Sequence, residues 1–284
     1  MSLSWPMARD LESVEMLLLL EGIRRRYGYD FTHYSPASLK RRLVQAMGEA
    51  GIDRFTRMLD ALFHDDAMFD RFLKHMSVTV TDMYRDPQFY RTLREGVMLA
   101  LKTYPFVKIW HAGCATGEEV YSMAIMLEEE DFLGRTRIYA TDFNKYSLDT
   151  GRKGVYPSAR VPSYAANYRA AGGRHDLADY FSDGYELIKF KDTLKERITF
   201  SYHNLVTDGV FGEMNLICCR NVLIYFDKEL QNQVLGLLTN SLRHGGFLCL
   251  GTKESLKFSA VEDHFEPFDR KQRIYKKIGG ELHV

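Results

Sequence analysis

Residues 106–122 of this chain read F-V-K-I-W-H-A-G-C-A-T-G-E-E-V-Y-S. An apolar run leads into a turn bounded by Gly113 and Gly117, and a segment with helical periodicity begins at Glu118. In an open α/β sheet, ligands bind beyond the carboxyl ends of the strands, near the first turn from strand to helix. This stretch therefore predicts an α/β fold and the place of its site.

The alternation of strand and helix continues through the rest of the chain. It favours a mostly parallel sheet covered on both faces. Between about 154 and 196 the pattern loosens around an alternating segment, 185–191, which predicts a small β-rich insertion. The predicted strands are 107–112, 137–141, 197–202, 214–219 and 246–251, and the predicted helices are 118–130, 145–152 and 228–243.

The first third of the chain is predicted to be helical. Apolar residues repeat with helical spacing after Ser35-Pro36, and again over 55–63 and 68–76. A β-branched run at 77–81 interrupts the helices, and Asp86-Pro87 predicts the cap of a helix that continues to about 102. We expect a helical domain over 1–76, a linker and helix over 77–104, and the α/β domain over 105–284.

Composition excludes several classes of protein. Lys+Arg and Asp+Glu both total 38, so the chain lacks the basic charge of a nucleic-acid-binding protein. No apolar run approaches the roughly 20 residues of a membrane span, and no signal peptide is recognised, which predicts a cytoplasmic protein without membrane insertion. The cysteines lack C-x-x-C spacing, so we expect buried, reduced thiols and no metal site: Cys114, Cys218, Cys219 and Cys249.

The turn itself indicates which cofactor binds. The G-x-G-x-x-G spacing of a dinucleotide site is missing, and Glu118 and Glu119 would repel a pyrophosphate at the helix N-terminus. Asp142 ends the next strand, where an acid can accept hydrogen bonds from ribose hydroxyls. A nucleoside with positive charge and no phosphate satisfies all three acids, and S-adenosylmethionine is such a molecule. Alternatively, acids at a helix N-terminus are stabilising through the helix dipole alone, by about 0.3–1 kcal/mol.

A second polar pair, Arg220 and Asn221, follows the apolar strand 214–219. Such side chains are costly to bury without partners, so we expect them to bind ligand at the same edge of the sheet. A structural alternative is that Arg220 pairs with an acid of the core. His111, inside a strand, is interpreted as a satisfied core residue rather than a catalyst.

Four motifs together resemble the chemotaxis-receptor glutamate methyltransferases, the CheR family. They are W-H-A-G-C-A-T-G-E-E-V-Y-S, Y-A-T-D-F-N, C-R-N-V-L-I-Y-F and the linker T-V-T-D-M-Y-R-D, and the resemblance covers nearly the whole chain. It implies a class I, Rossmann-like methyltransferase sheet with an all-α N-terminal domain and a small β-subdomain. It also implies methyl transfer from S-adenosylmethionine to glutamates in the cytoplasmic helical bundle of a methyl-accepting receptor, by a monomer that releases S-adenosylhomocysteine.

The resemblance also assigns residues. Carried over position by position, the cofactor-binding set is Thr79, Thr81, Arg85, Gly113, Glu119, Asp142, Asn204, Leu205, Arg220 and Asn221. Arg85 and Tyr225 are expected to orient the acceptor or to complete the wall around the methyl group. Two positions depart from the family: Thr79 stands where asparagine is usual, and Lys253 replaces a small polar residue in G-T-K-E.

No general base is expected, because a glutamate with a pKa of about 4.3 is already an anionic nucleophile at neutral pH. Arg85 has a structural alternative, an ion pair with Asp82 or Asp86. The basic cluster Lys40-Arg41-Arg42 is predicted to dock an acidic receptor helix.

Two other functions stay open at this point. One is a regulatory module that binds S-adenosylmethionine with little catalysis. The other is an NAD-dependent oxidoreductase, which shares the turn and Asp142 but requires a third glycine.

Overall fold

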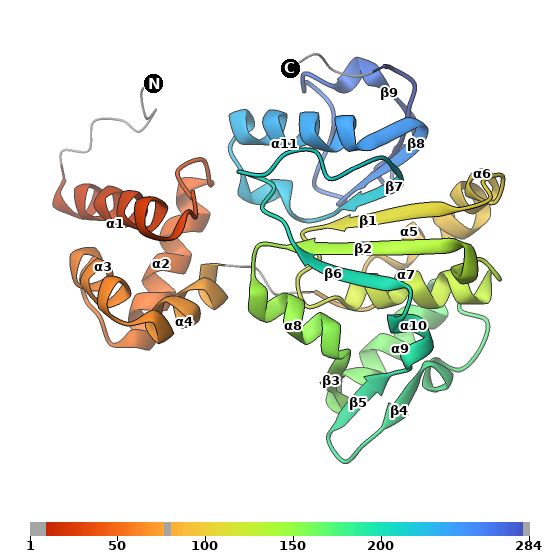
Figure 1. Cartoon of the computed structure of the whole chain (residues 1–284), viewed down its shortest axis with the longest axis horizontal. Helices are drawn as coiled ribbons and strands as arrows, with labels where there is room; N and C mark the ends of the chain where they lie inside the picture. The colour runs from red at the N-terminus through yellow and green to blue at the C-terminus, as the bar shows by residue number, and fades with distance from the viewer. Residues whose placement is uncertain (1–9, 77–80, 281–284) are drawn as a thin grey trace. The chain divides into compact units, whose positions relative to one another are not determined.

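The computed structural model describes residues 10–76 and 81–280 and divides into two compact units (Figure 1). The first unit takes the chain up to residue 78 together with 224–231, and the second takes 79–223 and 232–284. Thr79, one of the predicted cofactor-binding residues, lies outside the described residues. Within the described ranges, none of the helices combines the length and the apolar character that crossing a bilayer requires.

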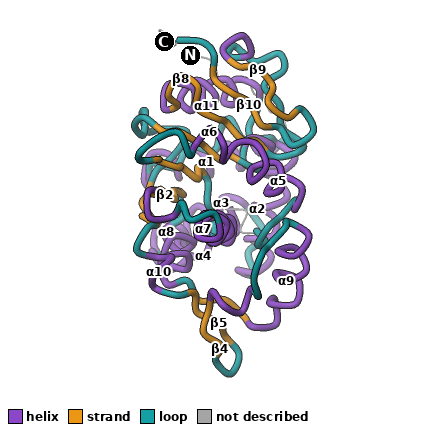
Figure 2. Tube along the Cα trace, turned by 90° about the vertical axis from the view of Figure 1, so that its right-hand side faces the viewer, coloured by secondary structure: helices purple, strands orange, loops and turns teal. Residues whose placement is uncertain are grey.

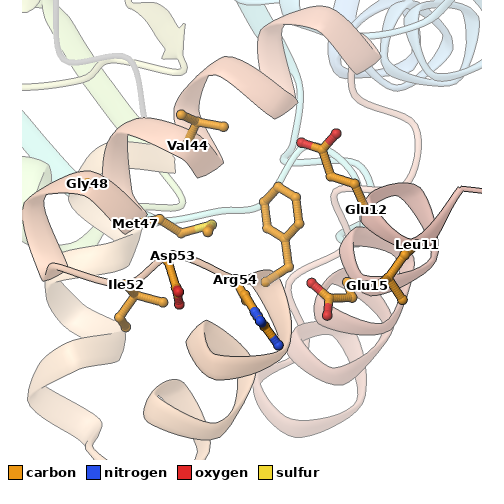
Figure 3. Close-up of a pocket in the computed structure, with 10 residues that line it drawn as sticks. Leu11, Glu12, Glu15, Val44, Met47, Gly48, Ile52, Asp53 and Arg54 are labelled. Carbon is orange, nitrogen blue, oxygen red and sulfur yellow. The ribbon is translucent and has the colours of Figure 1, made fainter.

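The first unit is helical. The predicted apolar stripe of α2, which includes Leu39, Leu43 and Met47, is buried. Figure 3 shows a pocket of about 650 Å³ in this unit, lined by residues of α1, of α2 and of the segment that leads into α3. The helices are α1 (Leu11–Tyr27), α2 (Pro36–Ala50), α3 (Phe55–His64) and α4 (Asp66–Met76).

The second unit contains a seven-stranded sheet in the order β6-β2-β1-β7-β8-β10-β9. The first five of these strands run parallel, and β10 and β9 close one edge antiparallel. The helices α7 and α8 pack against β2, and α8 also packs against β6 (Figure 1). The strands are β1 (Val107–Ala112), β2 (Thr136–Asp142), β6 (Ile198–Tyr202), β7 (Met214–Cys219), β8 (Leu242–Leu250), β9 (Phe265–Asp269) and β10 (Ile274–Lys277).

Further helices and several short turns connect the strands of the chain. Beside the sheet lie α7 (Glu118–Glu129), α8 (Lys145–Lys153) and α11 (Lys228–Ser241). The segment after the linker forms α5 (Pro87–Thr92), a π-helical turn (Leu93–Val97) and α6 (Met98–Leu101). The 3₁₀ turns are Leu133–Arg135, Ser158–Arg160, Leu177–Tyr180, Leu223–Tyr225 and Glu262–His264.

The insertion forms a separate sheet in the order β3-β5-β4. Its strands are β3 (Val155–Pro157), β4 (Phe181–Asp183) and β5 (Leu187–Phe190), and it also contains α9 (Val161–Ala170) and α10 (Asp192–Lys195). The helices were not predicted, so the insertion is mixed rather than only β. Figure 2 shows the β4–β5 hairpin at the end of this unit remote from β9.

Two predicted details are wrong. The strand predicted over 246–251 spans Leu242–Leu250, and α11 ends at Ser241 rather than at 243. Gly245 lies inside the strand with a φ of 74° and does not cap the helix. Asp86 occupies the N-cap position of α5 with a φ of 58°, but its side chain makes no capping hydrogen bond. Its carboxylate is used elsewhere, as described below.

Candidate functional site

The glycine turn and Asp142 lie side by side at the carboxyl edge of the sheet. The strands β1 and β2 are parallel, with Ala112 opposite Thr141, so both strands end at the same level. Gly113 has a φ of 75°, and a Cβ atom there would stand 2.6 Å from Val222 Cγ2. Only glycine fits this position, because both the backbone conformation and the space exclude a side chain.

The backbone N–H groups of the turn are bonded to β2. Gly113 and Cys114 both donate to the carbonyl oxygen of Thr141 at 2.9 Å, and Ala115 donates to Asp142 Oδ2 at 2.9 Å. A phosphate-binding turn presents its N–H groups to the ligand. These three donors are satisfied within the protein, so this glycine turn is not built to hold a phosphate.

Asp142 is buried and oriented from both sides. Its Oδ1 accepts from the Asn144 backbone N–H at 2.9 Å, and its Oδ2 accepts from Ala115. Burial raises the pKa of Asp142, while these hydrogen bonds oppose that rise. Each carboxylate oxygen retains a second lone pair, so Asp142 can still accept bonds from hydroxyl groups of a ligand.

Glu119 is the centre of a partly buried charge network. Its Oε1 lies 3.0 Å from His111 Nδ1, and its Oε2 accepts from Arg220 Nη1 at 2.8 Å. Burial would raise the pKa of Glu119, but the charge of Arg220 and the bond with His111 outweigh burial and lower it to about 2. His111 is thus held by Glu119 at Nδ1, while its Nε2 is buried without a hydrogen-bond partner among the described residues, and its interpretation as a core residue rather than a catalyst stays a prediction.

Arg220 binds two acids and an aromatic ring. Its Nη2 donates to Asp86 Oδ2 at 2.7 Å, and its guanidinium carbon lies 4.0 Å from the centre of the Phe89 ring. Its side chain is only 1% exposed. The alternative that Arg220 pairs with core acids is therefore confirmed, and Asp86 serves this ion pair instead of capping α5. Direct contact of Arg220 with the cofactor stays a prediction.

Glu118 has a different environment from its neighbour Glu119. It is 2% exposed, accepts from the Thr116 hydroxyl at 2.6 Å and lies 3.8 Å from Arg160 Nη1. Burial raises the pKa of Glu118, and its hydrogen bonds and Arg160 only partly offset this effect. Its contacts make it a structural residue of the turn.

Asn221 is held by Glu254, a residue that sequence reasoning did not assign. Asn221 has a φ of 62°, and its N–H donates to Glu254 Oε2 at 2.9 Å. The N–H of Gly251 donates to the same oxygen at 2.6 Å, and a Cβ atom on Gly251 would stand 2.8 Å from Asn221 N. The sequence signal for this contact was the G-T-K-E motif. Its Glu254 fixes the end of β7, whereas Lys253 is exposed.

Asn204 and Leu205 follow β6, which pairs with β2 so that Tyr202 lies opposite Asp142. Both residues are buried, and Asn204 Oδ1 accepts from the Val206 N–H at 3.0 Å. The fold thus brings seven predicted residues to the ends of four neighbouring strands: Gly113, Glu119, Asp142, Asn204, Leu205, Arg220 and Asn221.

The linker residues Thr81 and Arg85, and Tyr225, are not among these seven residues. The carbonyl of Thr81 accepts from Arg160 Nη2 at 2.8 Å. Arg85 is half-buried, and two acids near it in sequence, Asp82 and Asp86, pair with Arg160 and Arg220 respectively. Tyr225 belongs to the first unit. The roles of Arg85 and Tyr225 stay predictions.

The predicted docking cluster is not uniformly exposed. Lys40 and Arg41 are exposed, and Lys40 pairs with Glu12 at 2.9 Å. Arg42 is 8% exposed, donates to the Met76 carbonyl at 2.5 Å and stacks 4.4 Å from the centre of the Tyr225 ring. Arg42 is therefore held inside the helical unit by these contacts, and receptor docking by the cluster stays a prediction.

Comparison with known proteins gives matches to both parts of the chain. Residues 79–274 match the family described as CheR methyltransferase, SAM binding domain, and residues 15–77 match CheR methyltransferase, all-alpha domain. The Cher3 protein of Pseudomonas putida is 47% identical over 264 residues, which cover 93% of this chain and 97% of that protein.

Two further relatives are named chemotaxis protein methyltransferase. The protein of Listeria monocytogenes is 28% identical and is aligned over 88% of this chain and 93% of its own length. The protein of Salmonella typhimurium is also 28% identical and is aligned over 82% of this chain and 81% of its own length.

Proposed function

Because the chain belongs to the CheR family of S-adenosylmethionine-dependent methyltransferases, we propose that it methylates glutamate side chains of a chemoreceptor-type signalling protein. We place this reaction in the cytoplasm, on the helical bundle of the receptor, with the enzyme acting as a monomer. The alternative of an NAD-dependent oxidoreductase is wrong, because the SAM-binding domain of this family covers residues 79–274.

The observation that carries the proposal is the internal bonding of the glycine turn. Its donors at Gly113, Cys114 and Ala115 are taken by β2, while the charged carboxylate of Glu119 stays at the edge of the sheet with 18% of its side chain exposed. This arrangement suits a cofactor with positive charge and no phosphate. We assign Glu119 to the cationic part of the cofactor and Asp142 to its ribose.

The remaining cofactor contacts follow the same edge. We assign Asn204 and Leu205 to the adenine. We also assign Asn221, after the end of β7, and the linker residues Thr81 and Arg85 to cofactor binding. S-adenosylmethionine, when bound, supplies a methyl group on a positively charged sulfur, and S-adenosylhomocysteine remains as the product.

The chain's own task is to position the acceptor and to exclude water. The acceptor carboxylate is ionised at neutral pH, so no side chain needs to remove a proton. His111 is committed to Glu119 and is therefore not required as a base. We assign Arg85 and Tyr225 to the orientation of the acceptor, because holding the reacting groups in a fixed geometry accelerates their reaction.

Transfer of labelled methyl groups to purified receptor tests the proposal. We expect base-labile labelling of receptor glutamates, and about 100-fold less transfer by Arg85→Ala at saturating cofactor. Affinity for S-adenosylhomocysteine is measured in parallel by calorimetry. Arg169→Ala, which removes an exposed arginine of α9, is the control and should transfer normally.

Two outcomes would contradict this proposal in different ways. Cofactor binding without transfer to any receptor would favour the regulatory module that binds the cofactor with little catalysis. Unchanged turnover by a folded Arg85→Ala protein would remove Arg85 from the catalytic assignment.

A further inference from the structure

One arginine of the insertion, Arg160, contacts both the linker and the glycine turn. It is the last residue of the 3₁₀ turn Ser158–Arg160, directly before α9. Its Nη2 donates to the carbonyl oxygen of Thr81 at 2.8 Å and lies 3.4 Å from Asp82 Oδ1. Its Nη1 lies 3.8 Å from Glu118 Oε1. A planar guanidinium group presents several N–H donors in fixed directions, so one side chain can hold two segments at once.

Further hydrogen bonds of the insertion hold the same two segments. Asn167 of α9 donates from Nδ2 to the carbonyl oxygen of Met83 at 3.0 Å. The hydroxyl of Tyr156, in β3, donates to the carbonyl oxygen of Thr116 at 2.7 Å. Asn167 thus binds the linker and Tyr156 binds the turn, whereas Arg160 joins the linker to the turn.

Arg160 also supplies a counter-charge to the buried acid of the turn. The side chain of Glu118 is 3% exposed, and burial raises its pKa, whereas the Thr116 hydroxyl and Arg160 lower it. Asp82 raises the pKa of Glu118 further, because two carboxylates close together disfavour ionisation. Without Arg160, a buried carboxylate would face the acid of the linker, and the two segments would repel each other.

We propose that Arg160 is a positioning residue for the cofactor: it fixes the linker at Thr81 against the glycine turn at Glu118, so that both sides of the cofactor site are in place before S-adenosylmethionine binds. This inference rests on the proposed function, in which Thr81 and Glu119 contact the cofactor. Arg160 itself is assigned no contact with the cofactor or the acceptor. A preformed site binds more tightly, because binding does not have to order the segments that line it.

The binding of S-adenosylhomocysteine to the full chain tests this role without any receptor. We expect Arg160→Gln to weaken that binding, measured by calorimetry, by about 10-fold, because the guanidinium contacts with the linker and with a buried acid are lost. In methyl-transfer assays, the KM for S-adenosylmethionine should rise by a similar factor while kcat stays within about 2-fold, because saturating cofactor compensates for the lost preorganisation. Arg169→Gln, which removes an exposed arginine of α9, is the control and should match the wild type.

Two further variants separate positioning from a merely structural role. The double variant Arg160→Gln/Glu118→Gln removes both charges, so we expect it to recover part of the lost affinity. Arg160→Lys keeps the charge but lacks the fork of donors, so its affinity should lie several-fold below that of the wild type. It is the variant to measure if circular dichroism shows that Arg160→Gln does not fold. A lowered kcat with an unchanged KM for the cofactor would indicate loss of folded protein and would contradict positioning.

Failure of this inference differs from failure of the proposed function. Wild-type affinity of folded Arg160→Gln and Arg160→Lys for S-adenosylhomocysteine overturns the positioning role and leaves receptor methylation intact. A wild-type chain that binds S-adenosylhomocysteine but methylates no receptor contradicts the proposed function. In that case, weakened binding by Arg160→Gln still supports the positioning role.

Discussion

Glu118 and Glu119 are adjacent in sequence, yet the structure gives their carboxylates different properties. Burial dominates at Glu118 and raises its pKa, whereas Arg220 and His111 dominate at Glu119 and lower its pKa to about 2. The difference arises because Arg220, which follows β7, reaches only one of the two side chains of α7. Ionisation at this site is therefore set by tertiary neighbours rather than by residue type.

The lowered pKa of Glu119 predicts a pH-dependent contribution to stability. An acid whose folded pKa lies below its unfolded value stabilises the fold above the unfolded pKa, near 4.5, and loses this contribution as the pH falls towards 2. We expect Glu119→Gln to lower the free energy of unfolding by about 1.5–3 kcal/mol at pH 7. Urea denaturation should show this difference shrinking below pH 4.5. Glu128→Gln, on the exposed side of α7, is the control, and a difference independent of pH would contradict the prediction.

At the scale of elements, the ends of β7 and β8 are joined by one carboxylate. Glu254 Oε2 accepts from both Asn221 and Gly251, which holds Asn221 in a left-handed conformation. That conformation is unusual outside glycine and persists where neighbouring groups enforce it. The turn after β8 thereby supports a residue assigned to the cofactor.

Removal of this carboxylate should damage both stability and binding. We expect Glu254→Ala to lower the free energy of unfolding by about 1–3 kcal/mol, because a buried N–H group, that of Gly251, and a part-buried one, that of Asn221, lose their acceptor. Its affinity for S-adenosylhomocysteine should also fall, which calorimetry measures. Lys253→Ala, at the neighbouring exposed position, should match the wild type in both assays. Equal behaviour of the two variants would show that Glu254 does not support Asn221.

At the scale of the whole molecule, the chain combines a helical unit with a methyltransferase unit, and we assign receptor docking to the first. Within the predicted cluster Lys40-Arg41-Arg42, the exposed charges are those of Lys40 and Arg41. Arg42 is committed to Met76 and Tyr225, so its substitution would test packing rather than docking.

Charge reversal at Lys40 and Arg41 should weaken receptor methylation while cofactor affinity stays normal. Attraction between exposed charges is screened by salt, so we expect a several-fold loss of transfer at low ionic strength and a smaller loss at high salt. Arg57→Glu, an exposed reversal on α3 in the same unit, is the control. Receptor methylation that is unaffected at low salt would exclude this docking role.

Local patterns determined much of this protein without the structure. The strands at 107–112 and 214–219, the glycine turn and Asp142 were predictable because hydrophobic periodicity and turn residues act over a few neighbouring positions. The parallel arrangement of the strands then placed their polar end residues along one edge.

Only the tertiary structure decided how distant residues are paired. The contact of Arg42 with Met76, the ion pair of Arg220 with Asp86 and the hydrogen bond from Asn221 to Glu254 join segments far apart in sequence. The pairing of His111 with Cys218, and of Cys218 with Cys249, likewise depends on the register of three strands. No local spacing encodes such contacts, because they form only when the strands align and packing selects which side chains meet.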